Sequence, residues 1–492
     1  MFQLWGSLAT RPRRLGGRSV TAQLAPSWPP LAALDRLTGS ETPRIATRRP
    51  PGRSLGGPLI RWARDRLEIE LLGWQEWVLR RGLVRDKGRW SSRTVGVLVA
   101  RQSGKTTLAS VRALGGMVLF GEQVIGAAQN RDIALDAWRH ALEVAEDAAL
   151  DVHSVKMTNG REEFWIGRAR YKVVSSNRRG GRGLVADLVI MDELREHRDW
   201  DGWAALEKTR RARPSSQVWA LSTEGDASSL VLDDLERRGR VAAASRSVTD
   251  TAWFEWSAAP DRDRGDPGGW AESNPALGRL VAAETIASEY RNDPPEVFDA
   301  EVLCRRVASL RPWLAAGMWE SCTDPAATVP DGAEVCFSLD AGPELDHATI
   351  GVGWRRPDGR VHVEAVESFP SLAAASFRLA ELCTRWPALG VAALARSPSE
   401  AAARRATEGS GIRVLGVSTA EAGRAVAGMY EAVAARMVVH PDDPMTATHI
   451  AQMSSDGLAR RSSTVAVDAA VAVILARWGT VTTEPAQTWV AF

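Results

Sequence analysis

Residues 94–107 read TVGVLVARQSGKTT, and this stretch decides the fold. Its first seven residues are apolar and rich in β-branched side chains, which predicts a buried strand, and residues 106–120 have the pattern of a helix. The turn between them contains Gly104 and opens the helix, where exposed backbone N–H groups can bind phosphate oxygens. The stretch therefore predicts a phosphate-binding loop, although Val99 stands where the full G-x-x-x-x-G-K-[ST] pattern has its first glycine.

The residue types in this loop have separate expected roles. The Lys105 ammonium can hold β- and γ-phosphate oxygens, the Thr106 hydroxyl can ligate Mg²⁺, and Gly104 permits the tight turn. The predicted nucleotide-binding set in the loop comprises Arg101, Gln102, Ser103, Gly104, Lys105, Thr106 and Thr107.

A second stretch makes nucleotide hydrolysis the expected chemistry. Leu188–Met191 (LVIM) is an apolar strand pattern that ends directly in Asp192 and Glu193. We expect Asp192 to hold Mg²⁺ through water and Glu193 to polarise the attacking water. Alone, this would be a strand end with a helix-capping acid, but together with the loop it predicts an ATPase.

Three weaker signals add to this site. Residues 218–222 form a third strand pattern that ends in the hydroxyls of Ser222 and Thr223, a position that senses the γ-phosphate in motor ATPases. The loop 177–183 (NRRGGRG) is a flexible, guanidinium-rich segment, and Arg182 is its preferred arginine-finger candidate, with Arg178 and Arg179 as alternatives. Gln75, in LLGWQEWVL, has the context of an adenine-reading amide, although a buried helix would explain the same stretch.

The flanking patterns predict four parts of the chain. Short apolar runs alternate with helical segments around the loop, which is typical of an α/β domain with a parallel sheet. After Gly332 three strand patterns follow one another, at residues 335–339, 349–353 and 361–366, and helix–strand alternation and a closing helix complete the order expected of a ribonuclease-H-like domain. The expected parts are a basic N-terminal arm (1–60), a P-loop ATPase domain (61–255), a mostly helical lid or linker region (256–330) and a ribonuclease-H-like nuclease domain (331–492).

Two acids of the last part are candidate metal ligands. Asp340 follows the strand pattern 335–339, and Asp468 lies in VAVDAAV, an otherwise apolar helical stretch. A buried carboxylate is costly unless it is paired or metal-bound. We expect Asp340 and Asp468 to converge on divalent metal ions, as acids do in nucleases that clamp the attacking and leaving oxygens.

The composition excludes several protein classes. The 492 residues leave room for two to four domains, and 62 Lys+Arg against 60 Asp+Glu give a net charge of only +2, so any nucleic-acid surface must be local. Four irregularly spaced cysteines indicate reduced thiols, and no apolar run is long enough for a membrane helix. Residues 1–60 hold nine arginines and two acids, a composition that fits an extended arm or an organelle transit peptide.

In combination, the motifs resemble the large terminase subunit of tailed bacteriophages over roughly residues 67–480. The matching stretches are LLGWQEWVL, VARQSGKTT, RGLVADLVIMDE, ALSTEGD, residues 254–278, SLDAGPELDHATIGVG and VDAAVAVILA. The resemblance implies a DNA-packaging ATPase in the cytoplasm of a bacterial host cell. It would form a ring on the portal protein of the procapsid, receive double-stranded DNA from a small terminase subunit and cut concatemers with a nuclease that uses Mg²⁺ or Mn²⁺.

The same resemblance assigns the expected roles. It makes Lys105, Thr106, Asp192 and Glu193 the hydrolysis set, Ser222 and Thr223 the coupling motif, and Asp340 and Asp468 the nuclease ligands. The DNA contacts should be mainly arginine to phosphate, weakly sequence-specific and sensitive to salt.

One departure puts DNA cleavage in doubt. The family's fourth nuclease strand usually ends in a further Asp, and the equivalent residue here is Leu394, which cannot ligate a cation. Asp346 and Glu400 are the nearest acids that could replace it. Two alternatives stay open: a packaging subunit with a relic nuclease, and an ATP-dependent helicase or repair translocase. The latter would need a second RecA-like domain after about residue 260.

Overall fold

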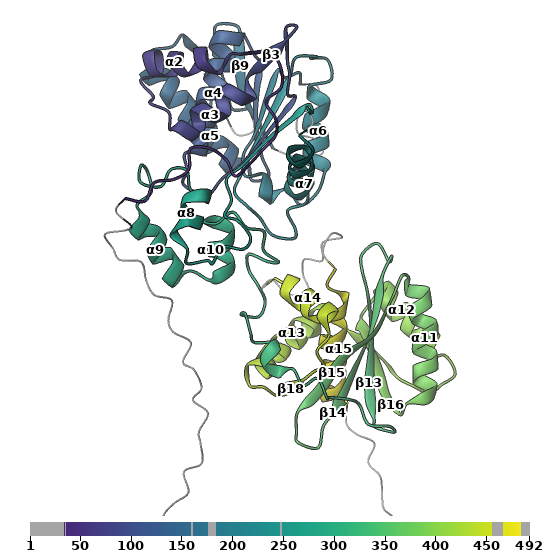
Figure 1. The fold of residues 1–492 in the computed structure, drawn as a ribbon. Helices are drawn as coiled ribbons and strands as arrows, with labels where there is room; N and C mark the ends of the chain where they lie inside the picture. Colours follow the sequence, from purple (N-terminus) through teal and green to yellow (C-terminus); the bar gives the residue numbers. More distant parts are fainter. Residues whose placement is uncertain are drawn as a thin grey trace, which may run out of the picture.

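The computed structural model describes residues 34, 36–158, 161–175, 184–246, 248–454 and 466–483. It consists of two α/β units, with a cluster of short helices beside the first (Figure 1). Within the described ranges no helix is both long and apolar enough to cross a membrane.

A nine-stranded sheet forms the first unit, in the order β1-β12-β5-β11-β10-β6-β9-β8-β7. The strands are β1 (Ile45–Ala46), β5 (Thr94–Leu98), β6 (Val124–Ala128), β7 (Val152–Lys156), β8 (Glu163–Ile166), β9 (Ala169–Ser175), β10 (Leu188–Met191), β11 (Gln217–Ser222) and β12 (Thr251–Glu255). From β12 to β9 all neighbours are parallel. The predicted parallel α/β sheet is therefore confirmed, and β11 lies between the P-loop strand β5 and the acid-bearing strand β10.

Helices cover both faces of this sheet. On one face lie α2 (Gly56–Leu67), α3 (Gly73–Gly82), α4 (Lys105–Phe120) and α5 (Arg131–Asp147), and on the other lie α6 (Asp201–Thr209) and α7 (Leu230–Ser245) (Figure 1). A small sheet of β2 (Arg53–Ser54), β3 (Val84–Asp86) and β4 (Arg89–Trp90) adjoins them. The strands are apolar on both faces because separate buried clusters form on each side, which is the usual pattern of a doubly covered parallel sheet.

The helical cluster contains α8 (Pro267–Ser273), α9 (Ala283–Asn292) and α10 (Pro295–Glu301), packed around Trp270, Phe298 and Leu303. The expectation of a mostly helical stretch up to residue 330 is wrong beyond Glu301. Residues 302–334, all described, contain the short 3₁₀ helix η2 (Glu320–Cys322) and isolated β-bridges but no α-helix. Their backbone and arginine side chains bind the neighbouring units instead of forming a helical hydrogen-bond ladder.

The second unit has a six-stranded mixed sheet, in the order β17-β16-β13-β14-β15-β18. Its strands are β13 (Val335–Ala341), β14 (Ala348–Arg355), β15 (Val361–Phe369), β16 (Ala388–Leu394), β17 (Val414–Val417) and β18 (Val438–Val439). The first three form the predicted antiparallel meander, and β16 and β17 add parallel to β13. This is the ribonuclease-H-like arrangement that the sequence predicted, not a second RecA-like sheet.

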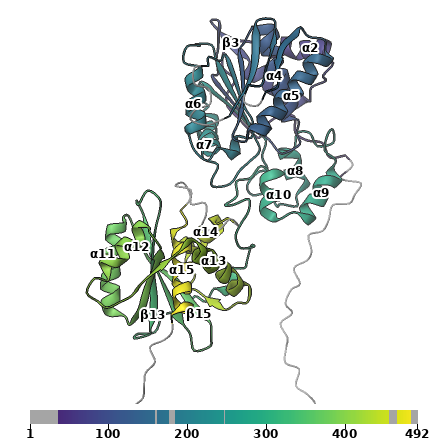
Figure 2. The same ribbon diagram turned by 180° about the vertical axis from the view of Figure 1, so that it is seen from behind.

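Helices α11 (Leu372–Arg385) and α12 (Pro398–Ala406) cover one face of this sheet (Figure 2). On the other face lie α13 (Thr419–Ala434), α14 (Pro444–Gln452) and α15 (Asp468–Thr482). Glycines let α15 lie close to the strands, since a Cβ atom at Gly351 would approach the Ala472 backbone to 2.8 Å, and one at Gly479 would lie 2.2 Å from the Cys336 sulfur. This close packing fixes Asp468, the first residue of α15, beside β13 and β14.

Candidate functional site: a P-loop and a pair of buried acids

The Lys105 side chain is buried and already bound within the protein. It is the first residue of α4, and its Nζ donates to Thr223 Oγ1 at 2.6 Å and to the carbonyl oxygens of Val99 and Ala100 at 3.4 and 3.3 Å. Gly104 before it has φ +91°, a left-handed conformation that favours glycine. The ammonium of Lys105 therefore lies between the P-loop and the end of β11.

Helix α3 supports the loop from outside. Trp74 Nε1 donates to the Ser103 carbonyl at 3.1 Å, and Gln75 Nε2 donates to the Gly104 carbonyl at 2.8 Å. The amide oxygen of Gln75 accepts from the backbone N–H of Leu72 at 2.8 Å. Gln75 thus supports the backbone of the loop in this structure, and recognition of adenine by its amide stays a prediction.

The two acids after β10 lie in different environments. Asp192 is buried, and its Oδ1 accepts from the N–H of Glu193 at 3.0 Å. Burial and the neighbouring Glu193 raise the pKa of Asp192 to about 6, although Lys105 opposes this shift. Such an excess of buried negative charge suits a bound cation. Glu193 has φ +49°, an uncommon conformation for a residue with a side chain, and lies 3.3 Å from Arg195 Nε through its Oε2.

The end of β11 joins the two halves of this site. Ser222 Oγ accepts from the N–H of Arg195 at 3.0 Å, and the next residue, Thr223, accepts from Lys105. Both residues are buried. The predicted residues Lys105, Asp192, Ser222 and Thr223 therefore meet at the carboxyl ends of three adjacent parallel strands.

The remaining predicted residues are less engaged. Arg101 Nη1 lies 3.7 Å from Glu301 Oε1, Gln102 has φ +58°, Thr106 is exposed at the start of α4 and Thr107 is half-buried. The arginine-finger candidate Arg182 and its alternatives Arg178 and Arg179 lie outside the described residues.

The two candidate nuclease ligands both neighbour Thr349. Asp340 on β13 is the register partner of Thr349 on β14, and Thr349 Oγ1 donates to Asp468 Oδ2. Both carboxylates are at most 3% exposed. Two buried carboxylates at adjacent positions fit a divalent cation. However, among the described residues no group of three or more His, Cys, Asp or Glu side chains is arranged to hold a metal ion.

Two histidines that sequence analysis did not single out also border Asp468. His347 Nε2 lies 3.3 Å and His449 Nδ1 lies 3.7 Å from Asp468 Oδ1. The Nδ1 atom of His449 also accepts from the N–H of Ala469 at 3.1 Å. Burial lowers the pKa of the His449 imidazole, and the neighbouring Asp468 opposes this shift.

Comparisons with known proteins agree with the sequence motifs. No family model and no curated protein matches the chain. Among solved structures, the bacteriophage HK97 large terminase is 17% identical, covers 87% of this chain and 100% of its own, and has a TM-score of 0.49. A large terminase from a thermophilic bacteriophage in complex with ADP is 10% identical over 80% of this chain and 94% of its own (TM-score 0.34). The large terminase nuclease from thermophilic phage G20c is 14% identical over 33% and 95% (TM-score 0.26).

The matched structures are phage large terminases. This is the family that the sequence motifs resemble.

Leu394 departs from the large-terminase pattern in a position that the structure now defines. The parallel register of β13 and β16 pairs Ser338 with Ala392, so Leu394 ends the strand that runs beside the one carrying Asp340. Leu394 packs against the apolar cluster of Val417, Val471 and Leu475. Both proposed substitute acids already have partners in the protein, and their role as metal ligands stays a prediction. Asp346 Oδ1 is bonded to His347 Nδ1 at 2.7 Å, and Glu400 accepts from Arg396 N–H at 2.6 Å and from Arg404 at 2.7 Å.

Sequence reasoning also missed four charged residues around the P-loop and the acids after β10. Arg195 Nη1 donates to Glu301 Oε1 at 2.9 Å and to the Glu224 carbonyl at 3.2 Å, and Glu224 is paired with Arg306. Glu301 and Arg306 come from the helical cluster and the segment after it, at a distance of about 100 residues from the motifs. Only Glu224, inside ALSTEGD, carried a sequence signal.

Proposed function

We propose that the chain is the ATP-hydrolysing motor subunit of a DNA-packaging machine of the large-terminase type. The observation that carries the proposal is the Lys105–Thr223 bond beside Asp192. It joins the loop that would bind ATP to a strand end that would report the state of the γ-phosphate, in a chain that also has a ribonuclease-H-like unit.

Each group of the first site would have one task. Lys105 would exchange the Thr223 hydroxyl for phosphate oxygens when ATP binds, which releases the end of β11. Glu193 would orient the attacking water and accept its proton. Thr106 and Asp192 would hold Mg²⁺, which neutralises charge on the phosphates when it is bound. A trans-acting arginine, with Arg182 as the preferred residue, would complete the charge compensation.

In the second unit, Asp340 and Asp468 would hold Mg²⁺ or Mn²⁺ and cut phosphodiester bonds of double-stranded DNA. Portal protein of the procapsid and a small terminase subunit are the expected partners, with a homo-oligomeric ring on the portal, in the cytoplasm of a bacterial host. The support for this part is the family resemblance together with the position of Thr349, which is the register partner of Asp340 and binds Asp468.

The ATPase part is tested by turnover with and without linear duplex DNA. Asp192→Asn should reduce ATP turnover at least 100-fold. Asp187→Asn is the matched control, because Asp187 lies just before β10 and binds the N–H of Gln123. Turnover in Asp192→Asn at half the wild-type level or more would refute the assignment. A helicase would separate strands of a forked duplex, whereas a packaging motor would displace a triplex strand without unwinding the duplex.

The nuclease part is tested by plasmid cleavage with Mn²⁺ or Mg²⁺. Asp340→Ala should abolish cleavage, and Asp358→Ala, which removes an acid from the turn between β14 and β15, should retain it. A relic nuclease is the second candidate, and Leu394 favours it. In that case the wild-type protein would bind DNA and hydrolyse ATP without cutting.

A further inference from the structure

A short segment connects the ATP site to the second unit and is held at both ends. Val307 forms a parallel bridge with Asp226, four residues after Ser222, and the N–H of Leu310 donates to Asp226 Oδ2 at 3.2 Å. Pro312 then bridges Ser454 of the second unit, and the N–H of Trp313 donates to the Met453 carbonyl at 2.9 Å. Five residues of extended chain span at most about 18 Å. The bridge at Asp226 therefore cannot move far without pulling on the second unit.

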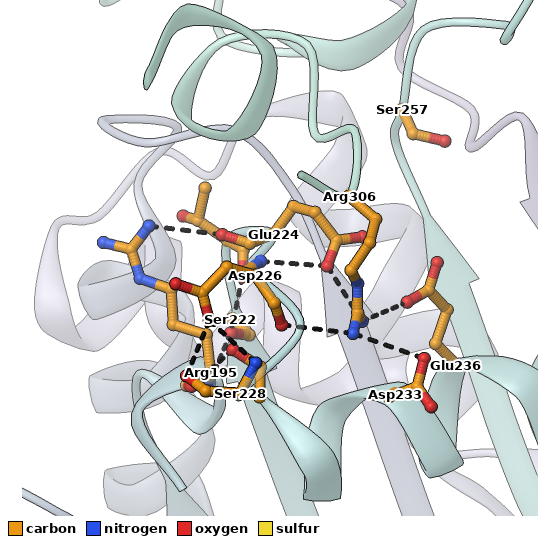
Figure 3. A network of polar contacts seen from close by, with 12 residues as sticks. Arg195, Ser222, Glu224, Asp226, Ser228, Asp233, Glu236, Ser257 and Arg306 are labelled. Carbon is orange, nitrogen blue, oxygen red and sulfur yellow. Dashed lines mark hydrogen bonds and ion pairs between the residues drawn. The ribbon is translucent and has the colours of Figure 1, made fainter. Parts of the chain in front are cut away.

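Arg306 fastens this connector, residues 304–312, to the first unit. Its Nη2 lies 3.0 Å from Glu224 Oε1 and 2.7 Å from Glu236 Oε2, and its Nη1 lies 3.2 Å from Asp233 Oδ1. Figure 3 shows the guanidinium reaching between Glu224 on the strand-end loop and the two acids of α7. A planar guanidinium can bridge several carboxylates at once, which a lysine ammonium does poorly.

The acids that Arg306 joins are costly to bury. Glu224 is fully buried and Glu236 nearly so. Burial and Glu236 raise the pKa of Glu224 to about 8, while Arg306 acts in the opposite direction. Without Arg306, the buried carboxylates of Glu224 and Glu236 would lose a cation that compensates their charge. The position of the Arg306 side chain and the position of the loop that carries Glu224 therefore depend on each other.

The residues before Glu224 contact both nucleotide motifs. Thr223 accepts from Lys105 of the P-loop, and Ser222 accepts from the N–H of Arg195, whose side chain lies beside Glu193. Three consecutive residues therefore bind the P-loop, the acid-bearing segment and the connector.

We propose that Arg306 is a positioning residue that transmits the nucleotide state of the Ser222-Thr223-Glu224 loop through the connector to the ribonuclease-H-like unit. The inference rests on the proposed ATPase function. Arg306 does not touch nucleotide, so its loss should uncouple the two units and leave ATP binding in place.

Hydrogen–deuterium exchange of the full chain, with and without ATPγS and Mg²⁺, tests this. In the wild type, nucleotide should change exchange in the P-loop, in residues 222–226 and in residues 313–322 and 444–454 of the second unit. In Arg306→Ala, the nucleotide-dependent changes in exchange in the P-loop and in residues 222–226 should persist. The nucleotide-dependent change in exchange in the second unit should be at least threefold smaller than in the wild type. Arg305→Ala is the matched control, because Arg305 binds the carbonyls of Ala259 and Arg262 inside the helical cluster.

Arg306→Lys covers the case in which the alanine variant does not fold. It keeps the charge, but the change in the second unit should still fall at least twofold. Wild-type transmission in either Arg306 variant, or an equal loss in Arg305→Ala, would overturn the proposal. So would a wild-type protein whose P-loop responds to nucleotide while the second unit does not. A P-loop that does not respond at all would instead refute the proposed ATPase function.

Discussion

The two α/β units place their acids in similar positions but surround them differently. In the first unit, Lys105, Asp192, Ser222 and Thr223 lie within a network that also includes Glu193 and Arg195, so most of the predicted groups have protein partners. In the second unit, Leu394 ends the strand that pairs with the Asp340 strand, and it packs against an apolar cluster. At a strand end that borders an apolar core, a leucine can replace a carboxylate because its side chain packs against the core. A residue inside a charged network cannot be lost in this way, because its partners would be left unpaired.

The largest expected effect concerns the first unit. Glu193→Gln keeps the shape of the side chain and removes the group that would accept a proton from water, so ATP turnover should fall 10²- to 10⁴-fold. Nucleotide binding, measured by fluorescence of a labelled ATP analogue, should persist. Glu196→Gln, three residues further on, is the control. If Glu193→Gln and Glu196→Gln both retained ATP turnover, Glu193 would not be the group that accepts the proton. The catalytic site of the first unit would then lack an acid, as the site of the second unit does.

A stability measurement sharpens the comparison. Arg112 in α4 is fully buried, and its Nη1 lies 2.6 Å from Glu122 Oε2. Arg112→Ala leaves an uncompensated buried carboxylate, so the free energy of unfolding of the first unit should fall by about 3–5 kcal/mol. Urea unfolding followed by tryptophan fluorescence would show this, with the exposed Arg139→Ala as control. A loss below about 1 kcal/mol would mean that this network contributes little.

The fold was largely predictable because its signals are local. The strands around GKT and DE, and the meander that ends in Asp340, are encoded in short apolar runs, and all appear in the structure. The irregular course after Glu301 was not predictable, since residues 302–312 owe their conformation to Asp226, Glu224 and Ser454, which are distant in sequence.

The same distinction applies to the candidate site. Lys105, Asp192 and Thr223 could be predicted because each begins, or directly follows, a recognisable element. Arg195, Glu301 and Arg306 lack such a context, and their roles depend on side-chain contacts across the fold. Gln75 was assigned to adenine from its motif alone, and the structure shows it bound to the loop backbone.

Acid should affect the first unit through His197. This side chain is 1% exposed, and neither ring nitrogen has a hydrogen-bond partner in the described part of the chain. Burial lowers its pKa from 6.5 to about 4. The folded state therefore favours the neutral imidazole of His197. The contribution of this group to the free energy of unfolding is fully present above pH 6.5 and is lost as the pH falls toward 4. Between pH 7 and pH 5 this loss amounts to about 2 kcal/mol.

The variant His197→Phe should remove that part of the pH dependence. Thermal unfolding at pH 5, 6 and 7 is the measurement, and the decline of Tm on acidification should be smaller in the variant. His362→Phe is the comparison in the second unit, because the equally buried His362 has Glu364 as a partner at 3.1 Å. Identical pH profiles for His197→Phe and the wild type would contradict the assignment.

The smallest and most informative effect concerns Leu394. Leu394→Asp would add a third carboxylate at the end of β16, which runs parallel to the strand that carries Asp340. Plasmid cleavage with Mn²⁺ should then rise about tenfold, the effect of 1.4 kcal/mol of transition-state stabilisation. The variant should also lose stability, because it removes a methyl-rich side chain from the cluster around Val471 and Leu475. Leu394→Asn matches the size without the charge and should lose stability without gaining cleavage. Cleavage unchanged in Leu394→Asp, in a protein that still folds, would mean that the missing acid is not what limits this unit. The histidines around Asp468 would then be the next groups to replace.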